Sequence, residues 1–422
     1  MSIAKNSVHD ISTKVFKDFG QEKWWKNFSQ PSLEEYVTAR KNTDDEPYPI
    51  VSVLELVNHQ VVQKLVRKLA KLTRQRFKRE VIFPLSARIK TFLVFMLAGN
   101  GNLSHFYRQL TYHKEEWGRQ LGYNGDGRGQ IILPAYKTLY KFMRLYLGPT
   151  IEENVPRLVA IVIKQARTYK IRVGQFIITD STPHHATKAD YDAKHSPHHK
   201  KKGYKEQRII DYYTDIPVAF CVSSIVAFDG DFVNQLLQQV IAAGCQPTDF
   251  WGDGHYITKD LLPLYVFDYN LHVHAREKGK WKGREVTEQE ITQMYQKLWK
   301  QPGFKPEDDE NCTHEFKLRF IWKHSPYAQH RLRIGEYFIM KIQQAHEFVP
   351  DITNQLCGIR STIERGFGQE KRFSAIKAME WCSFASRKSS YALRFLTDLV
   401  VSLFWMDQGR TKNLTSTATL VL

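Results

Sequence analysis

The sequence predicts an α/β protein in which a mixed β-sheet, flanked by helices, follows an all-α region. Three observations predict this fold class. Residues 48–174 carry apolar side chains at helical spacing, short apolar runs typical of strands begin at Gln175, and helical and strand patterns alternate beyond residue 230. Residues 1–45 are polar with few periodic signals, and we expect them to form an N-terminal arm.

The chain has 422 residues, more than one hydrophobic core usually supports, so we expect two or three domains. The patterns divide it into the arm (1–45), a helical domain (46–174), a first part of the α/β core (175–275), an insertion (276–348) and a second part of the core (349–422).

The composition points to a polyanionic partner. The formal charge is +17 and the sequence pI is near 9.4, which favours nucleic acid first and an anionic membrane surface second. The longest apolar segment, residues 91–98, is too short to span a bilayer, which takes about 18–20 residues. The N-terminus lacks the apolar core of a signal peptide, and the five scattered cysteines form no CxxC pair, so a reducing cytoplasm fits best.

The helical region carries two basic features. Residues 60–79 predict a basic amphipathic helix, either DNA-facing or simply a solubilising surface helix. The sequence predicts helices over 103–122 and 133–147 that are joined by a glycine-rich turn. This arrangement suggests a DNA-binding helix-turn-helix motif, and the alternative is a plain helical bundle. In the second of these helices Lys137, Lys141 and Arg144 are candidate DNA contacts.

The α/β region begins with a strand at 174–182 and continues with two strands within 206–228, joined by a turn at Asp215–Pro217. A helix (231–244), a strand ending at Trp251, a helix (257–270) and a strand (271–276) follow. Residues 276–348 break this alternation with polar turns and the β-like stretches 315–324 and 335–342, so we expect a β-rich insertion.

Three acids stand out by position. Asp180 ends the first strand, Asp253 follows a later strand, and Glu364 lies on a predicted helix. Acids at the carboxyl ends of strands lie where α/β sheets hold ligands, and an all-oxygen set suits Mg²⁺ or Mn²⁺. Two such ions would suit phosphodiester chemistry. Any one of these acids, taken alone, is more simply a strand-end cap.

The order of three motifs adds a resemblance. TDST at 179–182, GDGHY at 252–256, and Arg360, Glu364 and Lys371 in an R-x3-E-x6-K pattern resemble the DDE transposases of bacterial insertion sequences. The closest branch carries a tyrosine-arginine-glutamate-lysine signature, and Cys357 occupies its tyrosine position here. The resemblance covers roughly residues 175–406.

This resemblance implies a ribonuclease-H-like core and cut-and-paste transposition in a prokaryotic cell, at the nucleoid. Asp180, Asp253 and Glu364 would hold two Mg²⁺ ions, with Mn²⁺ as a substitute, while Arg360 and Lys371 would hold phosphates. The partners would be double-stranded DNA, both terminal inverted repeats and target, and a second protomer in a dimer on paired ends. The alternatives are a transposase-derived DNA-binding protein and a site-specific nuclease without strand transfer.

The histidine-rich loop, the tryptophans of the insertion and the C-terminal helix each allow two interpretations. The loop after Asp180 holds five histidines, for which a zinc site is an alternative to phosphate contacts by the basic residues Lys200, Lys201, Lys202, Lys205 and Arg208. The insertion contains Trp281, Trp299 and Trp322. The resemblance implies that an aromatic residue of this region stacks on a displaced base, and the alternative is that these tryptophans pack in a core. The apolar C-terminal helix, residues 389–406, would be buried in the core or at a dimer contact, and we favour the core.

Overall fold

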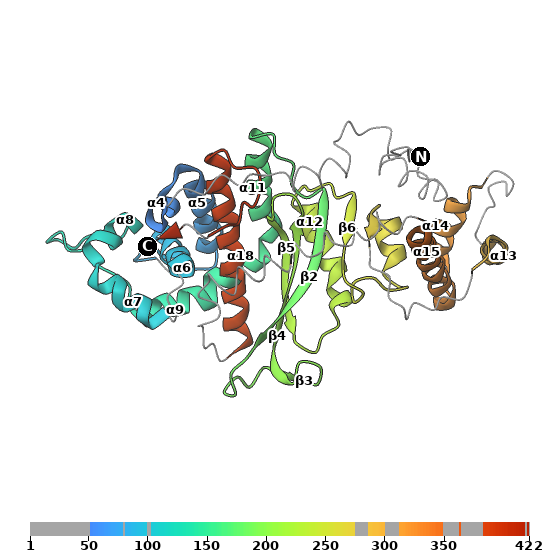
Figure 1. Cartoon of the computed structure of the whole chain (residues 1–422). Helices are drawn as coiled ribbons and strands as arrows, with labels where there is room; N and C mark the ends of the chain where they lie inside the picture. Colours follow the sequence, from blue (N-terminus) through green and yellow to red (C-terminus); the bar gives the residue numbers. More distant parts are fainter. Residues whose placement is uncertain are drawn as a thin grey trace, which may run out of the picture. The chain divides into compact units, whose positions relative to one another are not determined.

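The structure is a computed structural model (Figure 1) that describes residues 51–78, 81–98, 103–274, 286–299, 312–348, 363, 383–417 and 420–421. The described residues form two compact units. The first unit contains those up to 247 together with those from 363 onward, and the second contains residues from 248 to 348. The predicted arm lies outside the described residues, and the domain boundaries predicted from sequence stay predictions.

The N-terminal part of the first unit is helical, as predicted. Its elements are β1 (Val51–Ser52), α4 (Val53–Asn58), α5 (Gln60–Arg74), α6 (Leu85–Ala98), α7 (Leu103–Tyr112), a π-helical turn (Lys114–Gly118), α8 (Arg119–Leu121), α9 (Tyr136–Phe142), a second π-helical turn (Met143–Leu147), α10 (Gly148–Glu153) and α11 (Val155–Thr168).

Helix α5 confirms the predicted basic amphipathic helix. Its apolar side chains, among them Leu65 and Leu69, are buried in the core. Its basic side chains are exposed on the other side: Lys64, Arg67, Lys68, Lys71 and Arg74. The helix therefore packs by its apolar stripe and presents a cationic face to solvent.

The predicted helix-turn-helix has a longer connection than that motif requires. Residues 113–135 separate α7 from α9 and include a π-helical turn, α8 and an antiparallel bridge between Gly125 and Ile131. A helix-turn-helix joins its helices by a turn of about 3–4 residues. The exposed Lys137 and Lys141 nevertheless lie four residues apart on one face of α9. A DNA-reading role for this helix stays a prediction.

The sheet of the first unit contains β2 (Phe176–His185), β3 (Lys194–Ser196), β4 (Lys201–Asp211) and β5 (Pro217–Ser224), followed by a 3₁₀ turn (Asp229–Phe232) and α12 (Val233–Ala242). Strand β4 pairs antiparallel with β2, β3 and β5. The strands confirm the sequence pattern, including the turn at Asp215, whose φ of 62° lies in the left-handed region. Part of the predicted basic loop is a β-hairpin, because β3 and the start of β4 pair across it.

Helix α18 (Phe384–Asp407) lies at the centre of the first unit (Figure 1). It contacts α4, α5, α6, α10, α11 and β5. Almost every residue from Ser386 to Met406 is buried, and Phe395 stacks on Phe220 of β5 with ring centroids 5.0 Å apart. The prediction that this helix belongs to the core is therefore confirmed.

The second unit begins with the parallel strands β6 (Asp249–Trp251) and β7 (His272–His274), which a π-helical turn (Leu264–Asp268) separates. Three helices follow: α13 (Glu288–Trp299), α14 (His314–His324) and α15 (Ala328–Phe348). Parallel β6–β7 and antiparallel β2–β4–β5 pairings together give the chain the mixed strand directions predicted from sequence.

The prediction of a β-rich insertion is wrong, because both β-like stretches are helical. In α14 the buried residues are Leu318 and Ile321, three apart, as one helical face requires. The Thr313 hydroxyl caps the helix by accepting the Phe316 N–H at 3.2 Å. Aromatic and charged residues alternate in 315–324, which is typical of a strand, but packing against the rest of the unit stabilises the helix.

Candidate functional site

The prediction that Asp180 ends the first strand is wrong: Asp180 lies in the middle of β2 and is half-buried, because the strand stays paired with β4 as far as His185. The register places Asp180 opposite Arg208 of β4 and Ser181 opposite Gln207. Because successive strand side chains point to opposite faces, Asp180 and Ser181 belong to different faces of the sheet. One carboxylate oxygen of Asp180, Oδ1, accepts the backbone N–H of Ser181 at 2.8 Å.

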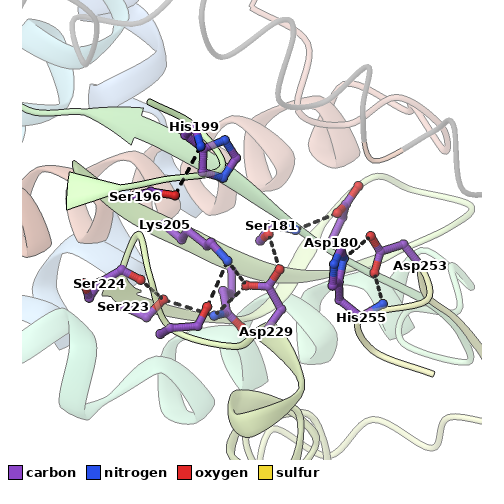
Figure 2. A network of polar contacts seen from close by, with 12 residues as sticks. Asp180, Ser181, Ser196, His199, Lys205, Ser223, Ser224, Asp229, Asp253 and His255 are labelled. Carbon is purple, nitrogen blue, oxygen red and sulfur yellow. Dashed lines mark hydrogen bonds and ion pairs between the residues drawn. The ribbon is translucent and has the colours of Figure 1, made fainter. Parts of the chain in front are cut away.

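The face that carries Ser181 holds a compact polar network (Figure 2). The Ser181 hydroxyl donates to Oδ2 of Asp229 at 3.0 Å, and Lys205 Nζ lies 2.8 Å from Oδ1 of the same carboxylate. Asp229 is buried, and Gln207 Nε2 approaches its Oδ1 at 3.5 Å. Lys205, predicted as a DNA contact, is instead engaged by the buried Asp229 carboxylate.

The face that carries Asp180 holds a buried chain of charges between the sheet and α18. Arg208 is 5% exposed, pairs with Glu206 through Nε, and places Nη1 2.9 Å from Asp398. Asp398 also lies 2.8 Å from Arg394, and Glu206 lies 3.5 Å from His184. Arg208, also predicted as a DNA contact, is instead buried and paired with the carboxylates of Glu206 and Asp398.

Glu206 is fully buried, and its charge is maintained by its neighbours. Burial by itself would raise the pKa of this carboxyl, but the Arg208 charge and the contact with His184 outweigh it and hold the pKa below the ordinary value. A carboxylate that stays charged inside the core depends on its cation. The charged state of Glu206 therefore depends on Arg208 and His184 remaining in place.

Asp253 belongs to the second unit and follows the carboxyl end of β6 by two residues. Its Oδ1 accepts the His255 N–H at 2.7 Å, and its Oδ2 lies 3.1 Å from His255 Nδ1. The buried Tyr256 closes the same turn by donating its N–H to the Asp253 carbonyl at 3.0 Å. The turn therefore holds the carboxylate at the end of a parallel strand, where α/β sheets place ligand-binding groups.

The strand before this turn is fixed by a second polar cluster. Asp249 lies 2.8 Å from Nε2 of His274 and 3.6 Å from Nδ1 of His272. Burial raises the pKa of Asp249, yet hydrogen bonds from the two histidines outweigh it and hold the pKa well below its ordinary value. His274 also stacks on Trp251, two residues before Asp253, with centroids 4.5 Å apart.

The predicted triad is only partly within the described residues. Asp180 and Asp253 lie in different compact units, and Glu364 lies outside the described residues together with Arg360, Lys371 and Cys357. Ile363, directly before Glu364, is helical and buried. The triad as a metal-binding set stays a prediction.

The chemistry of the described donors fits a hard cation. Asp180 and Asp253 offer half-buried carboxylates at strand positions, and oxygen donors of this kind are those that Mg²⁺ and Mn²⁺ prefer. Within the described ranges, no group of three or more His, Cys, Asp or Glu residues is placed to hold a metal ion. Glu364, the third predicted ligand, is beyond these ranges.

The remaining candidate contacts differ in exposure. Lys200 occupies the hairpin turn after β3 with a φ of 53°, and Lys201 and Lys202 are exposed at the start of β4. In α14 Trp322 is half-exposed, lies under the Arg331 guanidinium at 5.3 Å and has its Nε1 3.4 Å from Asp268. Trp281 lies outside the described residues.

Comparison with known families decides the class of the protein. The model of the transposase DDE domain matches residues 172–397, more than half of the chain. The chain belongs to the DDE transposase family. Family membership implies DNA binding, and DDE transposases generally use divalent metal ions. Comparisons with curated proteins and with solved structures found no match. No helix of the described residues is long and apolar enough to cross a bilayer.

Sequence reasoning missed the residues around Asp180. Ser181 and Asp229 are 48 positions apart, and Asp229 lies between the predicted strands (206–228) and the predicted helix (231–244), where no pattern singles it out. The pairing of Glu206 with Arg208 had a signal in the sequence, because residues two apart in a strand share a face. Asp398 offered none, since it lies 190 positions from Arg208.

Proposed function

We propose that the chain is the DDE transposase of an insertion sequence, which binds transposon ends and catalyses metal-dependent DNA cleavage and strand transfer. The supporting observation is the family match over residues 172–397, a range that includes Asp180, Asp253 and Glu364. Asp253, two residues beyond the carboxyl end of β6, occupies a position suited to a ligand site, and Asp180 offers a half-buried carboxylate in the middle of β2.

In this proposal Asp180, Asp253 and Glu364 hold two Mg²⁺ ions, for which Mn²⁺ substitutes. The ions would activate the attacking oxygen and stabilise the leaving one, as in other two-metal sites. Arg360 and Lys371 hold the phosphates beside the cut, with Cys357 in place of the branch's tyrosine. The protein contributes positioning and charge neutralisation rather than a covalent nucleophile.

The proposed substrate is double-stranded DNA, both the terminal inverted repeats and the target. Lys137, Lys141 and Arg144 in the helical region and Lys200, Lys201 and Lys202 at the β3–β4 hairpin are the proposed phosphate contacts. Two ends must be cut and joined to one target, so we propose a homodimer on paired ends. The setting would be a prokaryotic nucleoid.

The substitution Asp180→Ala tests this function. We expect the variant to lose cleavage of terminal-repeat DNA in Mg²⁺ or Mn²⁺ and to bind that DNA like the native chain, because the carboxylate serves chemistry rather than affinity. Asp231→Ala, at an exposed position near the start of α12, is the matched control and should cleave normally. Cleavage can be followed on gels and binding by mobility shift.

Full cleavage by Asp180→Ala would refute the assignment. Joining assays with pre-cut ends separate a transposase from a nuclease, since a nuclease gives no joined product. The DNA that flanks the gene supplies the terminal repeats for these assays.

A further inference from the structure

Ser181 is hydrogen-bonded to two carboxylates, one through its backbone and one through its side chain. Its backbone N–H donates to Oδ1 of Asp180 at 2.8 Å, and its hydroxyl donates to Oδ2 of Asp229 at 3.0 Å (Figure 2). Ser181 therefore links the Asp180 carboxylate, through its N–H, to the Asp229 carboxylate, through its hydroxyl.

Asp229 is itself fixed. Its carboxylate is buried, with Lys205 Nζ at 2.8 Å and Gln207 Nε2 at 3.5 Å from Oδ1. Lys205 also donates to the carbonyl of Ala227 at 2.9 Å, which ties the connection between β5 and α12 to β4. The network thus spans β2, β4 and the turn that opens α12, and its negative charge is balanced by one ammonium.

Core packing alone does not explain an ion pair at this place. Apolar residues of similar volume stabilise a buried position at least as well, so a buried charge pair is weak evidence for stability. What the pair provides is a fixed acceptor for Ser181 directly beside Asp180. Carboxylates that bind metal ions are commonly held by such hydrogen-bonded neighbours.

We infer that Asp229 and Ser181 are positioning residues, which orient the Asp180 carboxylate for a divalent metal ion from the opposite face of the sheet. The inference rests on the proposed function, in which Asp180 is a metal ligand. Asp229 touches neither metal nor DNA in this arrangement, and it acts only through Ser181.

The experiment compares Ser181→Ala, Ser181→Thr, Asp229→Asn and the exposed control Asp231→Asn in the full chain, with and without terminal-repeat DNA. Binding of Mn²⁺ is measured by the electron paramagnetic resonance of the free ion, which requires no catalysis. Losing an outer hydrogen bond to a metal ligand typically costs about 10–100-fold in metal affinity. Both Ser181→Ala and Asp229→Asn keep the bond from the Ser181 N–H to Asp180 and remove or weaken only the bond between the Ser181 hydroxyl and Asp229. We therefore expect Mn²⁺ binding to weaken by about tenfold, the lower end of this range.

Ser181→Thr keeps the hydroxyl and should bind Mn²⁺ like the native chain, as should Asp231→Asn. In cleavage assays the Ser181→Ala variant should need more Mn²⁺ for half-maximal rate and regain most of the rate at saturation, whereas a merely structural defect would persist at saturation. Unfolding midpoints should match the native chain for Ser181→Ala, which removes one oxygen atom. That variant carries the test if Asp229→Asn does not fold.

Native Mn²⁺ affinity in Ser181→Ala would overturn the inference, as would a Ser181→Thr variant as weak as Ser181→Ala. Failure of the proposed function gives a different result. In that case Asp180→Ala itself binds Mn²⁺ like the native chain, or the native chain does not cleave terminal-repeat DNA.

Discussion

Replacing Arg208 by methionine should destabilise the first unit strongly. The change removes a guanidinium that pairs with Glu206 and lies 2.9 Å from Asp398, and it keeps much of the side-chain volume. Removing one partner of a buried ion pair costs about 3–5 kcal/mol. Asp398 retains Arg394 at 2.8 Å and Glu206 retains only His184 at 3.5 Å, so the uncompensated charge is that of Glu206. We therefore expect a loss near the lower end of this range.

The loss should depend on pH. In the native chain the pKa of Glu206 is below its ordinary value of 4.5, so the group contributes stability above pH 4.5 that is lost as pH falls through its folded pKa. Without Arg208, burial dominates and raises the folded pKa above 4.5. Glu206 then destabilises the variant at neutral pH, and the variant regains stability as pH falls toward 4.5. The difference between the two proteins should therefore be smaller at pH 5 than at pH 7.5.

Urea unfolding followed by tryptophan fluorescence at the two pH values measures both effects. Arg172→Met, at an exposed position before β2, is the control and should change the free energy of unfolding by at most about 0.5 kcal/mol. Adding Glu206→Gln to Arg208→Met should recover part of the loss, because no unpaired charge then remains. The reasoning would be refuted if Arg208→Met lowered the free energy of unfolding no more than Arg172→Met does, or lowered it equally at both pH values.

Two further predictions concern other parts of the chain. An added Cβ at Gly335 of α15 would overlap the carbonyl oxygen of Lys259, so Gly335→Ala should destabilise the second unit by about 1–3 kcal/mol in urea unfolding, whereas Gly127→Ala, with open space around it, should not. A native unfolding curve for Gly335→Ala would contradict the close approach. The double substitution Lys201→Ala and Lys202→Ala should lower the salt dependence of terminal-repeat binding, reducing the log–log slope by about 2, since each phosphate contact contributes about 1. Lys164→Ala on α11 is its control, and an unchanged slope in the double variant would remove the hairpin from the DNA interface.

Local patterns predicted the first unit well. Strands β2, β4 and β5 follow from apolar runs bounded by turn residues, and α5 follows from leucines at helical spacing. The same reasoning failed for α14, where the run from Glu315 to His324 alternates like a strand but packs by residues three apart. Short amphipathic stretches satisfy both periods, and only the surrounding packing decides between them.

The sequence predicts those parts of the candidate site that lie in short motifs. It does not predict the contacts between residues that are far apart in the sequence. Asp180 and Asp253 could be singled out because each follows or ends an apolar strand pattern. The contact between Ser181 and Asp229 arises from the antiparallel arrangement of β2, β4 and β5, which no local pattern specifies. Arg208 follows a run of basic residues, a pattern typical of an exposed position. In the structure its place in β4 directs the side chain inward, where it pairs with Asp398.

The position of α18 has a consequence for biosynthesis. Helices α4, α5, α6, α10 and α11 and strand β5 all contact this helix, yet all are synthesised before it. Chains emerge from the ribosome N-terminal end first. The apolar surfaces of these elements that contact α18 therefore stay exposed until residues 384–407 have been synthesised. Contacts between residues this far apart in sequence also form slowly. A message truncated before α18 would therefore yield a product that cannot complete its core, and the cell would handle it as an aggregation-prone chain rather than as a shortened transposase.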